Sequence, residues 1–167
     1  MGVPESKEQG LNKPVFITAL RMLAGKRLSR AQLQKKLRDR GFAPDAVREA
    51  VAECERRKYI DDRTFAQLFV ASVLERKAIG PLRLMRDLLK QGIDADLARE
   101  TIAQTADGDD ARLERAIEKL EISRPGERFD RLARRLVTQG FTAPAVSRAL
   151  RQRAARGPAL EELEEMP

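Results

Sequence analysis

Three stretches of this chain repeat one pattern of leucine, glycine and a large apolar residue. They are QLQKKLRDRGF at 32–42, RLMRDLLKQGI at 83–93 and RLARRLVTQGF at 131–141. Each has leucines eight and four residues before a glycine, and a Phe or Ile directly after it. Leucines four residues apart lie on one face of a helix, so each stretch predicts an amphipathic helix that ends at its glycine. Three copies of one pattern predict one structural unit used three times.

The glycines Gly41, Gly92 and Gly140 are predicted to be the C-terminal caps of these helices. Glycine adopts the left-handed conformation without a Cβ penalty, which is why it commonly ends helices. In the Schellman form of this cap, the residue directly after the glycine packs against the residue four positions before the glycine. All three predicted pairs are apolar, namely Leu37 with Phe42, Leu88 with Ile93 and Leu136 with Phe141. The glycines lie about 50 residues apart, a period that indicates a repeat architecture.

Helix starts are also marked in the sequence. Ser29 and Gln32 have the spacing of a capping box, which opens the helix that ends at Gly41. The predicted N-caps two residues after the glycines are Ala43, Asp94 and Thr142. The helices that follow carry the apolar pairs Val47 and Val51, Leu97 and Ile102, and Val146 and Leu150, the middle pair slipped by one residue. A further helix precedes each pair, at about 15–24, 62–76 and 109–121.

These signals predict an all-α protein, an elongated array of three tandem three-helix repeats. The predicted boundaries are a flexible N-terminal lead at 1–14, repeats at 15–61, 62–107 and 108–156, and an acidic C-terminal tail at 157–167.

The charge of the chain favours an anionic or acidic partner. The 33 Lys and Arg residues outnumber the 26 Asp and Glu residues, for a net charge of +7 and a pI of about 10.0. Six residues before each glycine, opposite the leucine face, stand Lys35, Arg86 and Arg134. The predicted basic stripe for a partner or DNA comprises Lys35, Lys36, Arg76, Lys77, Arg83, Arg86, Arg131, Arg134 and Arg135. A merely solvated helix face is the alternative explanation.

The composition excludes several classes of chemistry. The chain has no histidine and one cysteine, so a Ser-His-Asp triad is excluded and most zinc sites are not expected. Cys54 is predicted to be a small core residue, and a single cysteine fits a reducing, cytoplasmic location. Asp61 and Asp62 form an acidic pair that a metal-dependent nuclease could use, but helix capping is the favoured interpretation. No cofactor, no metal and no membrane span are expected.

The order and spacing of three motifs resemble the RecX family of bacterial recombination regulators. The motifs are RLSRAQLQKKLRDRGF, YIDDRTFAQLFV and KAIGPLRLMRDLLKQGI, and the resemblance covers about residues 19–150. The chain departs from the family pattern at Gln32, Asp87, Leu84 and Thr64. None of these departures breaks a predicted cap or core position.

The resemblance implies a function that charge alone does not. RecX-like proteins bind the RecA recombinase filament and inhibit its ATPase, strand-exchange and coprotease activities. They block filament extension or promote disassembly, and they carry out no chemistry. For this chain we therefore expect a monomeric, non-enzymatic regulator whose partners are the RecA filament and DNA within or beside it. The alternative is a basic helix-turn-helix-like protein that binds DNA directly, although aromatic residues for base stacking make up only 4% of the chain.

Overall fold

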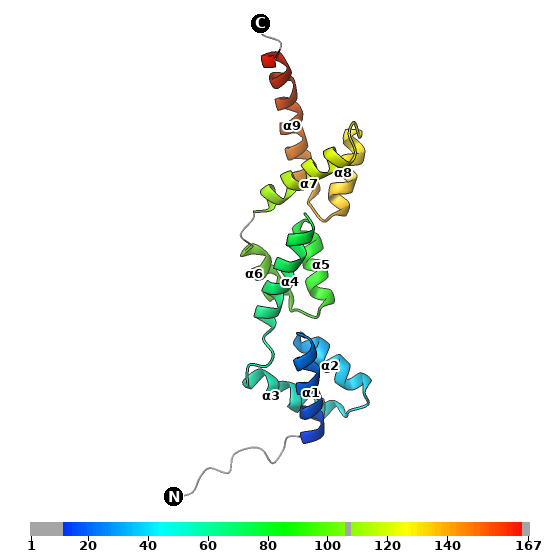
Figure 1. Ribbon diagram of the computed structural model, residues 1–167, viewed down its shortest axis with the longest axis vertical. Coiled ribbons are helices and arrows are strands. Elements are labelled where there is room, and N and C mark those ends of the chain that lie inside the picture. The colour runs from blue at the N-terminus through cyan, green and yellow to red at the C-terminus, as the bar shows by residue number, and fades with distance from the viewer. Residues whose placement is uncertain (1–11, 106–107, 165–167) are drawn as a thin grey trace, which may run out of the picture. The chain divides into compact units, whose positions relative to one another are not determined.

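The computed structural model describes residues 12–105 and 108–164, with side chains described as far as residue 155. All regular structure in these two ranges is α-helical (Figure 1). The helices are α1 (Lys13–Gly25), α2 (Arg30–Asp39), α3 (Pro44–Arg56), α4 (Asp62–Arg76), α5 (Pro81–Lys90), α6 (Ala95–Ala103), α7 (Asp109–Ser123), α8 (Phe129–Thr138) and α9 (Ala143–Glu164). The predicted all-α fold is confirmed.

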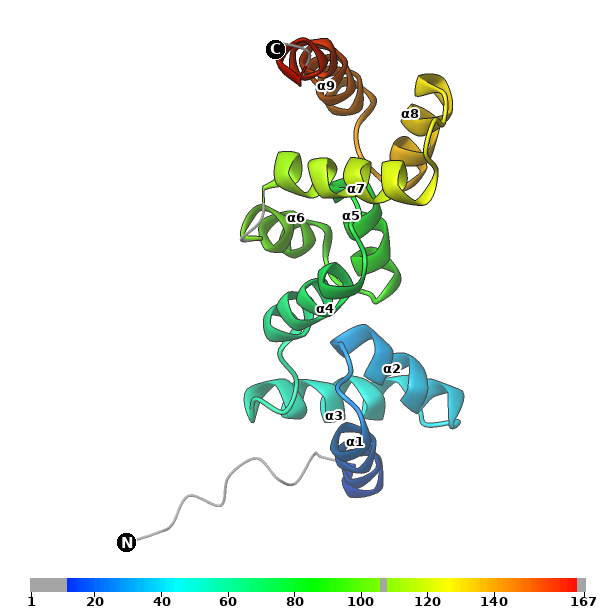
Figure 2. The ribbon, with the colours of Figure 1, turned by 45° about the horizontal axis from the view of Figure 1, so that its top comes forward.

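Contacts between residues divide the chain into two compact units. Unit 1 contains the chain up to Phe69 together with Leu88–Ala98, and unit 2 contains Val70–Asp87 together with the chain from Arg99. The division passes through α4, α5 and α6, so the second repeat contributes to both units. Helices α1, α2 and α3 pack together in unit 1, and α7, α8 and α9 pack together in unit 2 (Figures 1 and 2).

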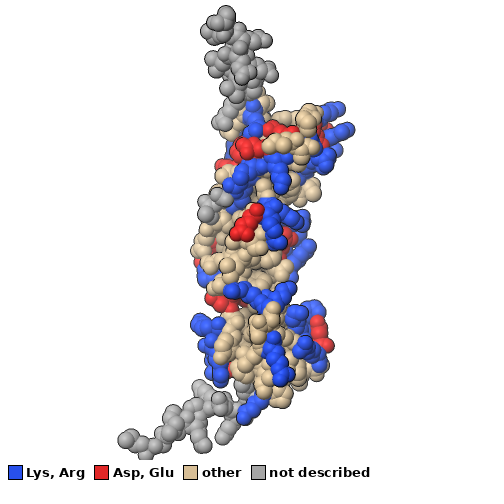
Figure 3. Space-filling model, viewed as in Figure 1, with Lys and Arg blue, Asp and Glu red and all other residues tan. Residues whose placement is uncertain are grey.

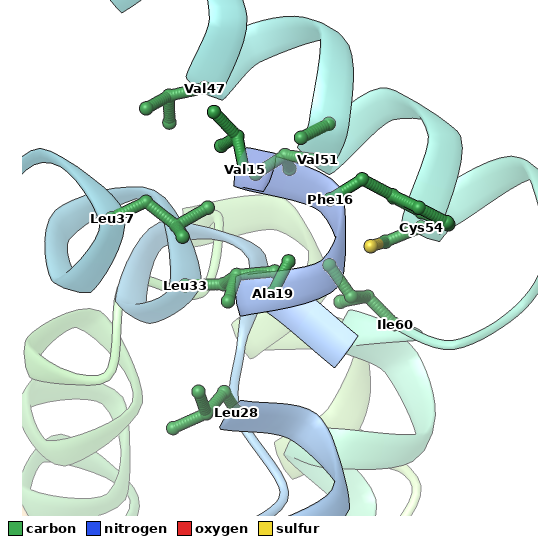
Figure 4. Packing of buried hydrophobic residues seen from close by; sticks show 11 residues of the cluster. Val15, Phe16, Ala19, Leu28, Leu33, Leu37, Val47, Val51, Cys54 and Ile60 are labelled. Atoms are coloured by element: carbon green, nitrogen blue, oxygen red, sulfur yellow. The ribbon is translucent and has the colours of Figure 1, made fainter. Parts of the chain in front are cut away.

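The first three helices bury one aliphatic core. Leu33 and Leu37, the predicted inward leucines of α2, are fully buried with Val47 and Val51 of α3. Val15 of α1 joins this cluster, as Figure 4 shows. Full burial of one such side chain contributes about 1.5–3 kcal/mol, so this cluster is the main source of stability for the first repeat.

The third repeat builds an equivalent core in unit 2. Leu132 and Leu136 of α8 are buried against Leu113 and Ile117 of α7 and against Val146 of α9. The same leucine spacing therefore supplies the middle-helix face of both cores.

The second repeat keeps the same register, so the predicted one-residue slip in α6 is wrong. Leu97 and Ile102 are only half-buried, whereas Ala98 is fully buried. Ala98 stands six residues after Gly92, as Val47 stands six residues after Gly41. The small size of Ala98 hid the inward position from a search for large apolar residues.

All three predicted glycine caps are confirmed. The φ angles of Gly41, Gly92 and Gly140 are +85°, +78° and +95°. The residue after each glycine donates its N–H to the carbonyl of the predicted leucine, at 3.4 Å for Phe42 to Leu37, 3.2 Å for Ile93 to Leu88 and 3.2 Å for Phe141 to Leu136. Each glycine N–H also donates to the carbonyl three residues before it, which completes the Schellman pattern.

The predicted starts of α2 and α4 are confirmed as well. Ser29 and Gln32 form both hydrogen bonds of a capping box. Asp61 caps α4, because its carboxylate accepts the N–H of Arg63 and both the N–H and the hydroxyl of Thr64. Those hydrogen bonds from Thr64 lower the pKa of Asp61 below its ordinary value.

Helix α7 begins without a side-chain cap, unlike α2 and α4. The N-cap is Gly108, which makes no side-chain cap hydrogen bond. Asp109 lies in the first turn and pairs with the buried Arg112, while Asp110 pairs with Arg148 at 3.2 Å. Their negative charge still suits the N-terminal end of a helix.

The described residues cover the predicted N-terminal lead and C-terminal tail only in part. Helix α1 begins at Lys13, so the last two residues of the predicted lead at 1–14 are helical. The rest of the lead, 1–11, lies outside the described residues. Helix α9 continues through Gly157 and Pro158 to Glu164. The side chains of the predicted acidic tail at 157–167 lie outside the description, so its separate role stays a prediction.

Within unit 1, the glycine cap of α5 contacts the start of α2. Ser29 Oγ donates to the carbonyl of Gln91 at 2.5 Å, and Gln32 Nε2 donates to Gln91 Oε1 at 2.6 Å. Gly92 lies so close to Ala31 that an added Cβ would overlap the Ala31 side chain. We call this contact the first repeat junction.

Within unit 2, the glycine cap of α8 contacts the start of α5 in the same way. The N–H groups of Gly80 and Leu82 donate to the carbonyls of Gln139 and Gly140, at 3.0 Å and 3.1 Å. An added Cβ on Gly140 would overlap Arg83, including its backbone nitrogen. In this second repeat junction, N–H groups that the start of α5 leaves free donate to carbonyls that the end of α8 leaves free.

The glycine caps differ in their surroundings, which generates a stability prediction. All three substitutions to alanine force a side chain into the left-handed conformation, at a cost of about 1 kcal/mol. A Cβ on Gly41 meets nothing within 4 Å, whereas one on Gly92 or Gly140 collides with the neighbouring repeat. We expect Gly41→Ala to lower the free energy of unfolding by about 1 kcal/mol, and Gly140→Ala to lower it by at least about 1 kcal/mol more. Urea denaturation measures both.

Gly92→Ala provides an internal control for this prediction. Ala31→Gly removes the side chain with which the new Cβ collides, so the double variant should be more stable than the sum of the single changes. Ala31→Gly should show no such coupling with Gly41→Ala. Equal losses from all three glycine substitutions would contradict the repeat junctions.

Cys54 is a core residue, as predicted, and its burial predicts an alkaline transition. Its side chain is fully buried, and this burial raises the pKa of the thiol from 9.0 to about 11. A raised pKa means that folding favours the neutral thiol, so the contribution to stability is complete below pH 9 and is lost as pH rises through 11. Relative to Cys54→Ala, the wild-type chain should lose thermal stability between these pH values. A difference in melting temperature between the two chains that stays constant over this pH range would contradict the prediction.

Candidate interaction surface

The middle helices α2, α5 and α8 present the predicted basic residues opposite their buried leucines. Lys35, Arg86 and Arg134 are all exposed, and the side chains of Lys35 and Arg134 retain 76% and 80% of their accessible surface. The leucines four and eight residues before each glycine are buried on the other face. One exposed cation therefore recurs at one helix position in every repeat.

Several cations of the basic stripe already have intramolecular partners. Lys35 pairs with Asp39 at 2.7 Å, Arg134 with Asp130 at 3.6 Å and Arg135 with Glu127 at 2.9 Å. Glu127 retains only 11% of its side-chain surface. The pairs of Lys35 and Arg134 join largely exposed groups, and such pairs contribute about 0–1 kcal/mol. An anionic partner could therefore displace them at low cost. Lys36, Arg86 and Arg131 have no ion-pair partner among the described residues.

Arg83 departs from the expected open face. It is half-buried, because its backbone packs against Gly140 in the second repeat junction. Its guanidinium Nε lies 3.2 Å from Asp87 Oδ2. The equivalent residue of α2, Gln32, lies in the first repeat junction, so only Arg131 of α8 stays exposed at this position.

Arg76 and Lys77, at the end of α4, are both exposed. Arg76 folds back on its own helix, where its guanidinium donates to the carbonyl and the hydroxyl of Ser72 at 2.9 Å and 3.0 Å. Lys77 makes no ion pair with a described residue. These two cations lie in unit 2, near the cations of α5 in sequence.

Positive charge is not confined to the predicted stripe. Figure 3 shows Lys and Arg side chains on the visible face of both units, with Asp and Glu between them. Exposed cations outside the stripe include Arg38 and Arg40 of the first repeat and Arg124 and Arg128 of the third. The middle-helix cations are distinguished by their repetition, since other helices are also basic.

The acidic pair at the start of α4 is used in capping and packing. Asp61 is the cap, and Asp62 Oδ1 accepts the N–H of Arg30 at 2.7 Å, which ties the start of α4 to the start of α2. Burial raises the pKa of Asp62, against the effect of that hydrogen bond. The described ranges contain no group of three or more metal-ligating side chains. None of their helices is both long and apolar enough to span a bilayer.

The repeat junctions were not predicted from the sequence. The sequence nevertheless carries a signal for each. The first junction has Ser29 directly before α2 and Gln91 directly before Gly92, and the second has Gly80 directly before α5 and Gln139 directly before Gly140. Gly41, the cap that lies in neither repeat junction, is preceded by Arg40 instead of a glutamine. A comparison of these positions between repeats could have found the junctions. Arg112, an almost fully buried arginine that donates to Thr105 Oγ1 at 2.7 Å, gave no such signal.

Family comparisons agree with a protein built from repeated three-helix domains. Residues 16–54 match the family model described as RecX, first three-helix domain, and residues 61–102 match RecX, second three-helix domain. These ranges contain all of α2, α4 and α5 and most of α1, α3 and α6, together with the glycine caps that end α2 and α5.

Proteins named regulatory protein RecX are similar in sequence to most of this chain. The regulatory protein RecX of Trichlorobacter lovleyi is 33% identical over 110 residues, which span 64% of this chain and 70% of that protein. The regulatory protein RecX of Chlorobaculum tepidum is 33% identical over 95 residues, 57% of this chain and 59% of that protein. That of Bacillus licheniformis is 28% identical over 145 residues, 84% of this chain but only 55% of its own length.

Solved structures support the fold. The crystal structure of RecX from Lactobacillus salivarius superposes with a TM-score of 0.74 at 20% identity and covers 84% of this chain and 94% of that chain. Taken together, the helices, the caps and the family matches define an all-α protein of repeated three-helix domains. The chain belongs to the RecX family.

Proposed function

We propose that this chain binds the RecA recombinase nucleoprotein filament and inhibits its ATPase, strand-exchange and coprotease activities. Inhibition would act by blocking filament extension or by promoting disassembly, without chemistry by the chain itself. Family membership supports the proposal, and the relatives are named regulatory proteins. The observation that carries it is the exposed cation at one position of all three middle helices, Lys35, Arg86 and Arg134.

Repetition of that cation suits a partner that is itself repetitive. A filament presents copies of one subunit surface, so several copies of one weak contact can add up on a single chain. Each exposed cation by itself contributes little, because surface charges are well solvated and screened at physiological salt. The repeated position therefore predicts binding to assembled recombinase in preference to free subunits.

Direct DNA binding is the second candidate, and the net charge of +7 favours it. Base stacking has few candidates, however, because Tyr59 and Phe129 are the large aromatic side chains that stay about half exposed in the described ranges, at 50% and 49%. Contacts limited to phosphates would give binding without strong sequence preference.

The two candidates differ in what the chain binds. The test measures binding of the full chain to RecA filaments, to RecA without DNA and to bare single- and double-stranded DNA at about 0.15 M salt. We expect tightest binding to the filament, together with slowed ATP hydrolysis. Tight, sequence-selective binding to bare duplex with no effect on RecA would overturn the proposal in favour of the second candidate.

The repeated cation has its own test. The triple variant Lys35→Glu, Arg86→Glu and Arg134→Glu should weaken inhibition of the RecA ATPase by about tenfold or more, because three contacts become repulsive. Helicity by circular dichroism should stay unchanged, since all three side chains are exposed.

A second triple variant controls for net charge in this test. It changes Arg27, Lys90 and Arg151 to Glu, three exposed residues outside the basic stripe, and so alters the net charge by the same amount. It should inhibit within about twofold of the wild-type chain. Equal inhibition by the two triple variants would show that the repeated cations are ordinary solvated surface.

A further inference from the structure

Unit 2 contains a pocket of about 530 Å³ between its helices. Residues of α4, α5, α7 and α8 line it, together with the segment that joins α4 to α5. The volume lies within the range of about 300–1,000 Å³ that is usual for ligand sites.

The lining of the pocket combines two chemical characters. Its buried and half-buried part is aliphatic, with Val73, Ile79 and Leu120 as the large members. Its exposed part is cationic and includes Arg76, Lys77 and Lys119. Arg83 also lines it and is already paired with Asp87, the single carboxylate of the lining.

The charge of this lining is largely unneutralised. Lys77 and Lys119 have no ion-pair partner among the described residues, and Arg76 donates only to uncharged oxygens of Ser72. Cations held at the mouth of an aliphatic pocket attract carboxylates more strongly than cations on an open helix, because the apolar wall lowers the local dielectric constant.

Two kinds of anion could meet such cations, and the lining favours one. Nucleic acid would bring bases as well as phosphates, and bases bind best on aromatic side chains, of which the lining has none. An aliphatic wall instead suits a leucine-like anchor, and the cations suit neighbouring Glu or Asp side chains.

We propose that this pocket binds an acidic peptide segment with an aliphatic anchor, supplied by a partner protein. The anchor occupies the aliphatic part, and flanking carboxylates meet Arg76, Lys77 and Lys119. If the partner is the recombinase, this inference rests on the proposed function. The binding of a peptide does not depend on that identity.

The test uses the full chain and fluorescence polarisation of a labelled peptide that does not occur in this chain, Glu-Glu-Leu-Leu-Glu-Glu, at about 0.05 and 0.15 M salt. Control peptides replace every Glu with Gln, or every Leu with Ser, and a labelled oligothymidylate serves as the nucleic-acid probe. We expect the acidic leucine peptide to bind at least about tenfold more tightly than either control peptide, because each control removes one of the two contacts.

Charge-matched variants locate the binding. Lys77→Glu with Lys119→Glu should weaken peptide binding by about tenfold or more, while Lys26→Glu with Lys90→Glu, exposed residues outside the pocket, should leave it within about twofold. Equal weakening by both double variants would show attraction by net charge alone and would overturn the proposal. So would equal binding of the three peptides, or oligothymidylate binding that depends on Lys77 and Lys119 when peptide binding does not.

These outcomes are independent of the proposed function, because no recombinase is present. Peptide binding at the pocket with no binding to RecA filaments would support the pocket and remove the recombinase as its partner. Filament binding that survives Lys77→Glu with Lys119→Glu, together with absent peptide binding, would leave the proposed function intact and overturn the pocket.

Discussion

The left-handed glycine cap is the constraint on which the rest of this structure depends. At Gly41, Gly92 and Gly140 it ends a middle helix within one residue and lets the next helix begin almost at once. It does so with local hydrogen bonds, because the N–H of the following residue satisfies a carbonyl that the helix end leaves free. The two leucines before it then face the core together, and the cation between them faces outward.

Two of these caps have a second role, which exploits the absence of a side chain. Gly92 and Gly140 let a neighbouring helix start approach to a distance that any Cβ would forbid. The approach brings the N-terminal end of one helix to the C-terminal end of another, an arrangement that opposite ends of helix dipoles favour. One residue type therefore shapes each repeat and, within each unit, joins it to a neighbouring repeat. Substitutions at Gly92 or Gly140 are therefore expected to disturb both the helix end and the contact with the neighbouring repeat.

Local signals predicted much of the fold and the exposure of the candidate surface. Ser29, Asp61 and the three glycines act through hydrogen bonds to residues within a few positions, and such contacts are readable from spacing alone. The same reasoning failed at Ala98, because a search for large apolar residues overlooked a small residue that is fully buried. The binding role of the basic stripe stays a prediction, because exposure is also what a solvated helix face shows.

The sequence by itself determined the helices, their caps, their inward leucines and the family, since each depends on residue type and on periods of four to about fifty residues. Only the tertiary structure decided that Ser29 meets Gln91, that Arg83 is half-buried against Gly140, and that Arg76, Lys77 and Lys119 surround one pocket. These groups lie tens of residues apart in the chain. Their proximity is set by how the repeats pack, and no local propensity encodes it.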